Sequence, residues 1–280
     1  MFNALRARLN GLFSNHAPAA LRASDAELAL FHSQGYFVRE SIFNAAELRV
    51  LREAVESIHR RMNALAMSED APKTEAVDEK RYQELDGSLV KWEWREGSTD
   101  IRSMEPFLFL HPDLEHIIDD PRLWLPARSI IGADKLSLFT DKLNFKRPQG
   151  APFPLHQDSP YFALDGRSVD RLLSIQIYLD DVTVENGCLW MVPGSHVHGI
   201  LPGIQNKGVL DRLYTDMERF SGAAPVPVEV PAGSAIFFHA HVIHGSKGNR
   251  TNRSRRAMVI TYQPAGNKCW KVDWERPIQM

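Results

Sequence analysis

The sequence predicts a mainly β fold with helices at its N-terminal side, an α+β chain built around an antiparallel double-layered barrel of the jelly-roll kind. Two observations support this fold class. Apolar residues recur at helical spacing in residues 24–131, whereas residues 132–264 alternate short apolar runs with turn residues. Such an order is typical of an antiparallel two-layered sheet braced by helices. We therefore expect one domain over residues 1–280, with a mostly helical bracing region at 24–131 and a jelly-roll core at 132–264.

Two helices are predicted in the bracing region, over residues 25–35 and 44–64, because apolar residues recur there every three or four positions. Ser24 and Asn44 stand where their side chains can cap the first backbone N–H groups. Between the helices, residues 35–39 are typical of a short strand.

The rest of the bracing region is more varied. Residues 67–84 are polar and lack periodicity, which predicts a mobile loop that is either a cover or a plain connector. Residues 87–94 alternate and predict a strand. Residues 112–131 predict a helical stretch that Pro121 breaks or restarts.

Short strands separated by turn residues are predicted throughout the core. Residues 185–187 (Glu-Asn-Gly) and 231–234 (Pro-Ala-Gly-Ser) are typical of tight turns. The predicted strands cover residues 135–146, 153–158, 172–179, 187–192, 226–230, 235–239 and 257–262.

Composition excludes several classes of protein. The formal net charge of -2 gives no electrostatic attraction to nucleic acid or to an anionic membrane, and no apolar run approaches the ~20 residues of a membrane span. Cys188 and Cys269 are too few for a disulfide framework, which fits a reducing compartment. Residues 1–24 contain three arginines and no acidic residue before position 25, so they predict either an amphipathic helix packed on the domain or a mitochondrial presequence. We favour the packed helix and a cytoplasmic protein.

His156 and Asp158 form a candidate metal-binding pair. They are separated by one residue in a predicted strand, and side chains at i and i+2 of a strand point the same way. With one more histidine they would make the two-His-one-carboxylate face that suits ferrous iron and leaves coordination positions open. The isolated motif also arises by chance, so the third ligand decides its meaning.

Three histidines compete to be that ligand: His239, His241 and His244. His244 precedes Ser246 and lies eleven positions before Arg255. A metal with open positions needs a chelating cosubstrate, and the far end of a dicarboxylate needs a fixed guanidinium that grips it with paired hydrogen bonds. We therefore favour His244, with the Ser246 hydroxyl as a further donor to the anion.

Four short motifs occur in order along the chain and are followed by Arg255. They are residues 154–158 (Pro-Leu-His-Gln-Asp), 185–189 (Glu-Asn-Gly-Cys-Leu), 192–196 (Val-Pro-Gly-Ser-His) and 244–246 (His-Gly-Ser). Together they resemble the phytanoyl-CoA dioxygenase family, and the likeness covers about residues 24 to 264. The resemblance implies a double-stranded β-helix, the cupin-like jelly-roll fold. It also implies a non-haem Fe(II) enzyme that uses 2-oxoglutarate and O2, most simply to hydroxylate an unactivated C–H bond of a small molecule with release of succinate and CO2.

Site residues follow from the resemblance position by position. It implies iron ligands at His156, Asp158 and His244, and a 2-oxoglutarate clamp at Arg255 with help from Ser246. It also implies cosubstrate contacts for Asn144 and Gln176, a part that Lys142 could take instead. If Arg255 points inward on its strand, Ala257 and Val259 share its face and Arg256 points outward.

The resemblance favours oxygen insertion over halogenation, because halogenating relatives have a small residue where Asp158 stands. Two alternatives stay open: a non-catalytic jelly roll that binds a metal or ligand, and the same enzyme class with desaturation, epimerisation or cyclisation as its outcome. The sequence predicts neither the substrate nor the oligomeric state.

The substrate side of the site is less specified. Three aromatic residues line the pocket or belong to the core, and three basic residues form either a solvated rim or a capture site for an acidic substrate. They are Tyr161, Phe162 and Trp190, and Lys247, Arg253 and Arg256, respectively.

Overall fold

The computed structural model describes residues 18–95, 97–166, 168–205 and 208–279. The expected amphipathic helix or presequence in residues 1–24 lies largely outside the described residues. Six α-helices are seen in the described part of the chain: α2 (Pro18–Leu21), α3 (Asp25–Gln34), α4 (Ala45–Ala66), α5 (Pro112–Glu115), α6 (Pro121–Ile131) and α7 (Ser159–Phe162).

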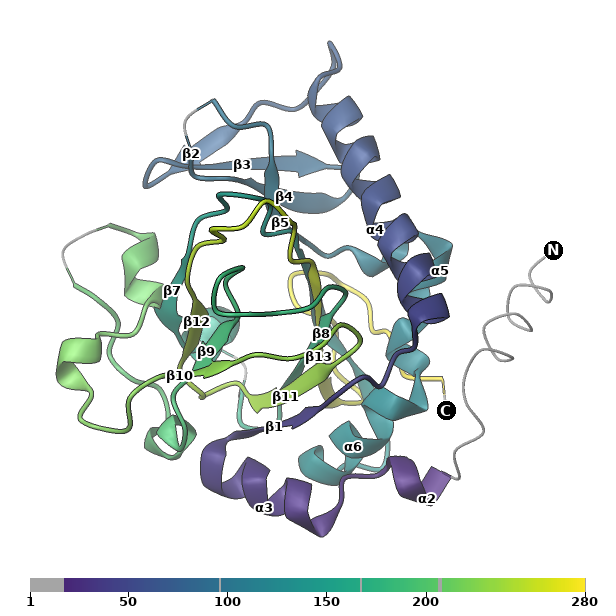
Figure 1. Cartoon of the computed structure of the whole chain (residues 1–280), viewed down its shortest axis with the longest axis vertical. Helices are drawn as coiled ribbons and strands as arrows, with labels where there is room; N and C mark the ends of the chain where they lie inside the picture. The colour runs from purple at the N-terminus through teal and green to yellow at the C-terminus, as the bar shows by residue number, and fades with distance from the viewer. Residues whose placement is uncertain (1–17, 96, 167, 206–207, 280) are drawn as a thin grey trace.

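Two antiparallel sheets form the core and confirm the predicted double-stranded β-helix (Figure 1). The larger has the order β1-β11-β8-β13-β6-β5-β4-β3-β2 and the smaller β10-β9-β12-β7. The strands of the larger sheet are β1 (Tyr36–Arg39), β2 (Glu75–Val77), β3 (Lys80–Leu85), β4 (Ser88–Trp92), β5 (Ile101–Glu105), β6 (Leu136–Asn144), β8 (Leu173–Tyr178), β11 (Ala235–His239) and β13 (Ala257–Pro264). Those of the smaller sheet are β7 (Phe153–His156), β9 (Leu189–Met191), β10 (Val226–Val228) and β12 (His244–Ser246).

Both predicted helix caps are present. Ser24 begins α3 and Asn44 begins α4, each accepting a hydrogen bond from the backbone N–H three residues later. In each case the side chain of a glutamate at that third position accepts a hydrogen bond from the backbone N–H of the cap residue, which completes a capping box. Pro121 restarts the helical stretch as the first residue of α6, because a missing N–H costs nothing at that position.

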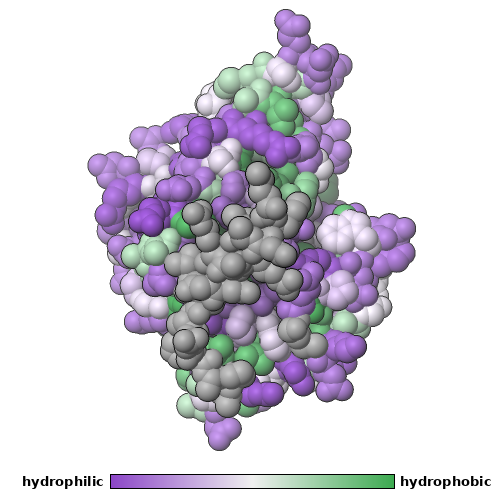
Figure 2. Space-filling model, turned by 90° about the vertical axis from the view of Figure 1, so that its right-hand side faces the viewer, coloured by the Kyte–Doolittle hydropathy of each residue, from purple (hydrophilic) through white to green (hydrophobic). Residues whose placement is uncertain are grey.

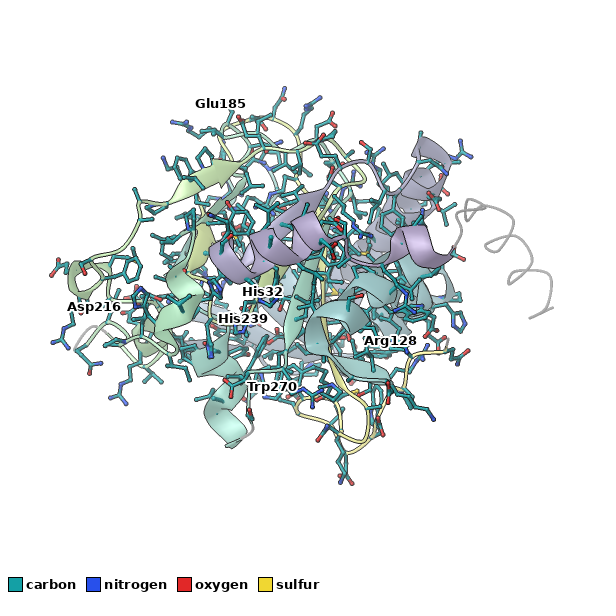
Figure 3. The ribbon with its side chains drawn as sticks, turned by 90° about the horizontal axis from the view of Figure 1, so that it is seen from below. His32, Arg128, Glu185, Asp216, His239 and Trp270 are labelled. Carbon is teal, nitrogen blue, oxygen red and sulfur yellow. The ribbon has the colours of Figure 1, made fainter. Side chains whose placement is uncertain are left out.

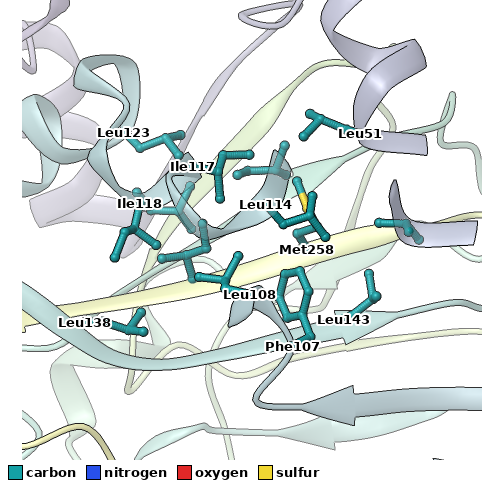
Figure 4. Close-up of a cluster of buried hydrophobic side chains, with 14 of the residues drawn as sticks. Leu51, Phe107, Leu108, Leu114, Ile117, Ile118, Leu123, Leu138, Leu143 and Met258 are labelled. Carbon is teal, nitrogen blue, oxygen red and sulfur yellow. The ribbon is translucent and has the colours of Figure 1, made fainter. Parts of the chain in front are cut away.

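The helices cover the outer face of the larger sheet. The buried side chains of α4 recur at three and four positions, which gives the helix one apolar face. Figure 4 shows Leu51 of α4 and Leu114 of α5 in one cluster with Met258 of β13 and Leu143 of β6. Since successive strand residues face opposite ways, this packing turns Lys142, the neighbour of Leu143, toward the other sheet.

The bracing region differs from its prediction in one respect: besides the strands predicted at residues 35–39 and 87–94, which are seen as β1 and β4, it also contributes β2, β3 and β5. Residues 67–84 in particular contain β2 and most of β3, joined by a turn in which Asp78 and Glu79 have positive φ angles of 48° and 63°. This hairpin ends the sheet and exposes side chains on both faces, so its sequence shows no apolar alternation. Whether the hairpin moves stays a prediction.

The predicted turn at residues 185–187 is formed. Gly187 adopts φ +81°, and a Cβ there would lie 2.5 Å from the Lys247 carbonyl oxygen, so only glycine fits. None of the helices in the described part of the chain combines the length and apolar character that a membrane crossing requires. On the surface coloured in Figure 2, hydrophilic residues surround small, separate apolar groups.

Candidate functional site

The triad of His156, Asp158 and His244 comes from two neighbouring strands of the smaller sheet and from the turn that follows one of them. His156 ends β7 and pairs in register with His244, the first residue of β12. Asp158 does not lie on the strand that the sequence predicts to residue 158. Its backbone is helical (φ -71°, ψ -31°) because the chain turns there into α7. The carboxylate reaches the imidazoles from this turn, not from a shared strand face.

The triad atoms converge on one point. Asp158 Oδ1 lies 3.9 Å from His156 Nε2 and 3.8 Å from His244 Nε2. One ligand atom from each residue lies within 4.8 Å of the other two, and no other group of His, Cys, Asp and Glu in the described residues meets that criterion. Such a spacing leaves room for one metal ion among the three atoms.

Backbone carbonyls fix both imidazoles. The Nδ1 of His156 lies 2.7 Å from the Pro154 carbonyl oxygen, and that of His244 lies 3.0 Å from the Val242 carbonyl oxygen. A proton on each Nδ1 leaves the Nε2 lone pair free for a metal. Burial and the neighbouring His244 hold the pKa of His156 well below its usual value, so this imidazole is neutral, as a metal ligand must be.

The competing histidines lie elsewhere. Figure 3 shows His239 beside His32 of α3, and the His239 Nδ1 accepts a hydrogen bond from the His241 backbone N–H. The His241 Nε2 lies 3.3 Å from Asp170 Oδ1. The structure therefore groups only His244 with His156 and Asp158.

A cavity between the two sheets joins the triad to the other predicted site residues. It is lined by the triad and by four of the residues that the resemblance pointed to, Asn144, Gln176, Ser246 and Arg255, together with Lys142. The Gln176 amide donates to the Tyr178 hydroxyl at 2.5 Å. The Asn144 Oδ1 is buried with no hydrogen-bond partner. Asn144 and Gln176, which the resemblance suggests as cosubstrate contacts, thus line the same cavity as Lys142, their alternative.

Arg255 defines one end of this cavity, which we call the arginine end, together with Ser246 and Lys146. Arg255 is 2% exposed, and its Nη2 donates to the Gly187 carbonyl oxygen at 2.6 Å. Its Nε has no partner, and no carboxylate of the described residues pairs with it. A buried cation with unused donors requires an anion. The neighbouring Arg256 points the other way, as expected, and pairs with Asp180 and Glu56.

Lys146 is a site residue that the sequence reasoning missed. It is 1% exposed, its Nζ donates to Ser246 Oγ at 2.8 Å, and it also reaches the Lys247 carbonyl oxygen. Burial, and after it the charge of Arg255, lowers its pKa to about 5. Its alternation with Lys142 and Asn144 along the predicted strand was the available signal, since all three share one side of that strand.

The opposite end of the cavity, which we call the lysine end, comprises Glu105, Lys142 and Tyr161 with Lys91 and Lys271 behind them. Glu105 Oε1 accepts a hydrogen bond from the Tyr161 hydroxyl at 2.8 Å and lies 3.0 Å from the Lys91 Nζ. The opposing charges, Lys91 foremost, outweigh the effect of burial and keep the pKa of Glu105 far below its usual value.

The aromatic and basic candidates divide between the cavity and the surface. Tyr161 and Phe162 line the cavity, and Trp270, labelled in Figure 3, packs against Tyr161 with ring centroids 4.5 Å apart. Trp190 does not line it and instead carries the exposed Lys247 over its ring at 4.0 Å. Arg253 is exposed.

The donor set fits the groups that the sequence suggested. Two imidazoles and a carboxylate with an open side suit Fe(II). The unpartnered Arg255 guanidinium and the Ser246 hydroxyl in the same cavity suit the far carboxylate of 2-oxoglutarate.

Comparisons with known proteins agree with this geometry. The family model "Phytanoyl-CoA dioxygenase (PhyH)" matches residues 31–257. The chain is 27% identical over 239 residues to methylphosphonate hydroxylase of Gimesia maris, covering 85% of this chain and 80% of that protein. It is 29% identical over 184 residues to 2-aminoethylphosphonate dioxygenase of an uncultured bacterium, covering 65% and 67%.

Solved structures show the same fold. The crystal structure of EctD from S. alaskensis with 2-oxoglutarate and 5-hydroxyectoine superposes with a TM-score of 0.67 at 25% identity, covering 91% of this chain and 80% of that one. The structure of EctD with bound Fe gives a TM-score of 0.66 at 26% identity, covering 92% and 81%. The chain belongs to the phytanoyl-CoA dioxygenase family and is an Fe(II)/2-oxoglutarate-dependent dioxygenase.

Proposed function

We propose that this dioxygenase hydroxylates an unactivated C–H bond of a small molecule, with one Fe(II) ion held by His156, Asp158 and His244 and 2-oxoglutarate held by Arg255 and Ser246. In this reaction one atom of O2 enters the C–H bond and the other enters succinate, which forms as 2-oxoglutarate loses CO2. The observation that carries the proposal is the presence, in one cavity, of a converging triad and a buried guanidinium with unused donors.

The triad residues would hold the metal in one fixed orientation. Their imidazoles are anchored at Nδ1, and Ser174 donates to Asp158 Oδ2 at 3.4 Å, which turns Oδ1 toward the imidazoles. Bound Fe(II) supplies the activation of O2. The Phe238 ring lies 4.9 Å from that of His244 and helps to exclude water from the reacting centre.

The arginine end would hold the cosubstrate. Lys146 donates to the Ser246 oxygen, so the Ser246 hydroxyl proton stays free to be donated to a carboxylate beside Arg255. A plain metal-binding jelly roll has no need for such a clamp. The buried guanidinium therefore favours the enzyme over the non-catalytic alternative.

The expected outcome is hydroxylation of a small substrate. Asp158 occupies a position from which its carboxylate excludes a halide from the metal, so the wild type should form no chlorinated product even at high chloride. Detection of such a product by mass spectrometry would overturn the assignment of Asp158. Relatives named for methylphosphonate and 2-aminoethylphosphonate support a small substrate.

Anaerobic titration with Fe(II) and then 2-oxoglutarate tests the ligands. The wild type should bind one Fe(II) tightly, and His244→Ala should lose this binding while keeping its fold by circular dichroism. His239→Ala and His241→Ala are matched controls that should bind as the wild type does. Normal binding by His244→Ala, with loss in either control, would show that the third ligand is wrong.

Turnover is the second readout. In air, the loaded wild type should release succinate when the correct small molecule is present, and His244→Ala should not. A protein that binds both Fe(II) and 2-oxoglutarate but releases no succinate across a broad substrate panel would support the non-catalytic alternative.

A further inference from the structure

The lysine end has an excess of positive charge. Its only carboxylate, Glu105, is already engaged by Lys91 at 3.0 Å and by the Tyr161 hydroxyl at 2.8 Å, and Lys271 stands 3.7 Å away. The Lys271 Nζ also donates to the Tyr161 hydroxyl at 2.8 Å. Glu105 is therefore fully used by these neighbours. Three amines and one carboxylate leave about two positive charges unbalanced.

Lys142 is the amine of the lysine end that forms no ion pair with Glu105, although its charge also helps to lower the pKa of that carboxyl. It lines the cavity, and no carboxylate of the described residues lies within ion-pairing distance of its Nζ. The nearest ring that it faces is Phe153, with the centroid at 5.7 Å. Burial lowers its pKa to about 8, so the amine is largely protonated at neutral pH. Glu105 and Asp158 act on the Lys142 charge from beyond ion-pairing distance, so an anion from outside the chain that contacts this buried ammonium directly would stabilise it.

The strand register places this cation away from the cosubstrate clamp. Lys142 pairs with Val259 of β13, which in turn pairs with Gln176 of β8. Val259 lies four residues beyond Arg255, which corresponds to about 13 Å of extended chain. The two cations therefore enter the cavity about four residues apart along β13, and the triad lines the same cavity.

We infer that the lysine end binds an anionic group of the substrate, a carboxylate or a phosphonate, and that Lys142 makes the direct contact. This inference rests on the proposed function, since it assigns the substrate class of the same site. Lys91 and Lys271 add long-range attraction but are occupied by Glu105 and Tyr161. An anion anchored on Lys142 places the rest of a small substrate beside the triad.

Calorimetric titration of the anaerobic Fe(II) and 2-oxoglutarate complex tests the inference. The probes are methylphosphonate, cyclohexanecarboxylate and the neutral cyclohexanecarboxamide. At least one anion should bind with a millimolar or tighter Kd, and the amide should bind at least about 30-fold more weakly than its carboxylate. Equal binding of the amide and the carboxylate would overturn the inference. So would the absence of anion binding at about 20 millimolar, the upper limit of the titration.

Variants locate the site. Lys142→Met should weaken the best anion by at least about tenfold while changing the 2-oxoglutarate Kd by less than about threefold. Glu105→Gln keeps an acceptor for Tyr161 but removes the competing charge, so it should tighten anion binding several-fold. Lys135→Met, which removes an exposed lysine before β6, is the matched control and should change neither Kd.

Two results separate the possible failures. If Lys142→Met weakens 2-oxoglutarate and leaves the anion unchanged, Lys142 belongs to the cosubstrate and the inference is wrong. If the wild type binds neither Fe(II) nor 2-oxoglutarate, the proposed function fails. The same probe titration on the metal-free protein then still tests the anion site by itself.

Discussion

The two ends of the cavity carry charge of the same sign but hold it in different ways. At the arginine end, Arg255 is 2% exposed and donates to a backbone carbonyl, with Lys146 buried beside it. At the lysine end, Lys91 and Lys271 have side chains 19% and 47% exposed and share one carboxylate. A guanidinium is a planar fork fixed for one carboxylate, whereas an ammonium is a point charge on a flexible stem. The first design suits one unchanging dicarboxylate, and the second suits a substrate whose anion is less closely matched.

The largest expected effect is at the arginine end. Arg255→Ala should raise the 2-oxoglutarate Kd by roughly a hundredfold or more, because it leaves a buried carboxylate without its paired donors. Fe(II) binding should be nearly unchanged. Titration of the Fe(II) charge-transfer band measures both.

Arg256→Ala is the control one residue along the chain. Arg256 is paired with Asp180 and Glu56 outside the cavity, so its loss should lower the Tm and leave the 2-oxoglutarate Kd within about threefold. A large loss of 2-oxoglutarate affinity in Arg256→Ala and none in Arg255→Ala would contradict the orientation of the two side chains.

A smaller effect is expected for Lys146, which acts through Ser246 and is a positioning residue. Lys146→Met should raise the 2-oxoglutarate Kd by about tenfold, because the Ser246 hydroxyl loses the donor that orients it. The double variant with Ser246→Ala should be no worse than Ser246→Ala alone. Additive losses in that cycle would show that Lys146 acts independently of Ser246.

Much of this arrangement could be predicted from the sequence, and the rest could not for physical reasons. The triad, Arg255 and Ser246 were found because short motifs fix their spacing. The position of Asp158 on a turn was missed, since β7 ends at His156 and the turn into α7 begins two residues before the end of the predicted strand. Lys142 was named only as an alternative cosubstrate contact and Lys146 was missed, because the strand alternation that they share does not show which lysines distant segments bury.

The hairpin β2–β3 was missed for a similar reason. β2 exposes side chains on both faces and β3 buries only Gln83 and Leu85, so the charged sequence of residues 75–85 resembles an irregular loop. The charge asymmetry between the two ends also depends on β5 and on the segment that carries Lys271, which only the fold brings together.

Asp141 offers a comparison with a buried charge outside the cavity. Burial raises its pKa to about 6, although the backbone N–H groups of Phe107 and Leu108 donate to it. Between about pH 4 and pH 6 the unfolded chain loses this proton while the folded protein keeps it. The free energy of unfolding should therefore fall as the pH rises through this window, by on the order of 2 kcal/mol.

Asp141→Asn should remove that fall, because the amide oxygen still accepts both hydrogen bonds and carries no charge. Urea denaturation of both metal-free proteins at about pH 4.5, near the lower end of the window, and at about pH 7, above it, measures the difference. The variant should gain stability relative to the wild type as the pH rises. An identical change in both proteins would show that Asp141 is ionised throughout.

The smallest effect is expected for residues 67–84, the segment predicted to be either a cover or a plain connector. Residues 67–84 approach the β9–β10 connection, where Asp78 Oδ2 accepts from the Leu210 N–H at 2.6 Å and the Lys80 Nζ lies 3.4 Å from the Tyr214 hydroxyl. Tyr214 forms an isolated β-bridge with His156. Hydrogen exchange of this segment should slow when cosubstrate and substrate are bound. Exchange that stays unchanged at saturation would identify a plain connector.

The division of the cavity between two anions is the central claim, and a double-variant cycle tests it most directly. The 2-oxoglutarate Kd and the Kd of the best anionic probe are measured for the wild type, Arg255→Ala, Lys142→Met and the double variant. Each single variant should lose affinity for its own ligand only, and the double variant should lose both by the sum of the two free-energy changes. Loss of both ligands in Lys142→Met alone, or of neither in Arg255→Ala, would contradict the account.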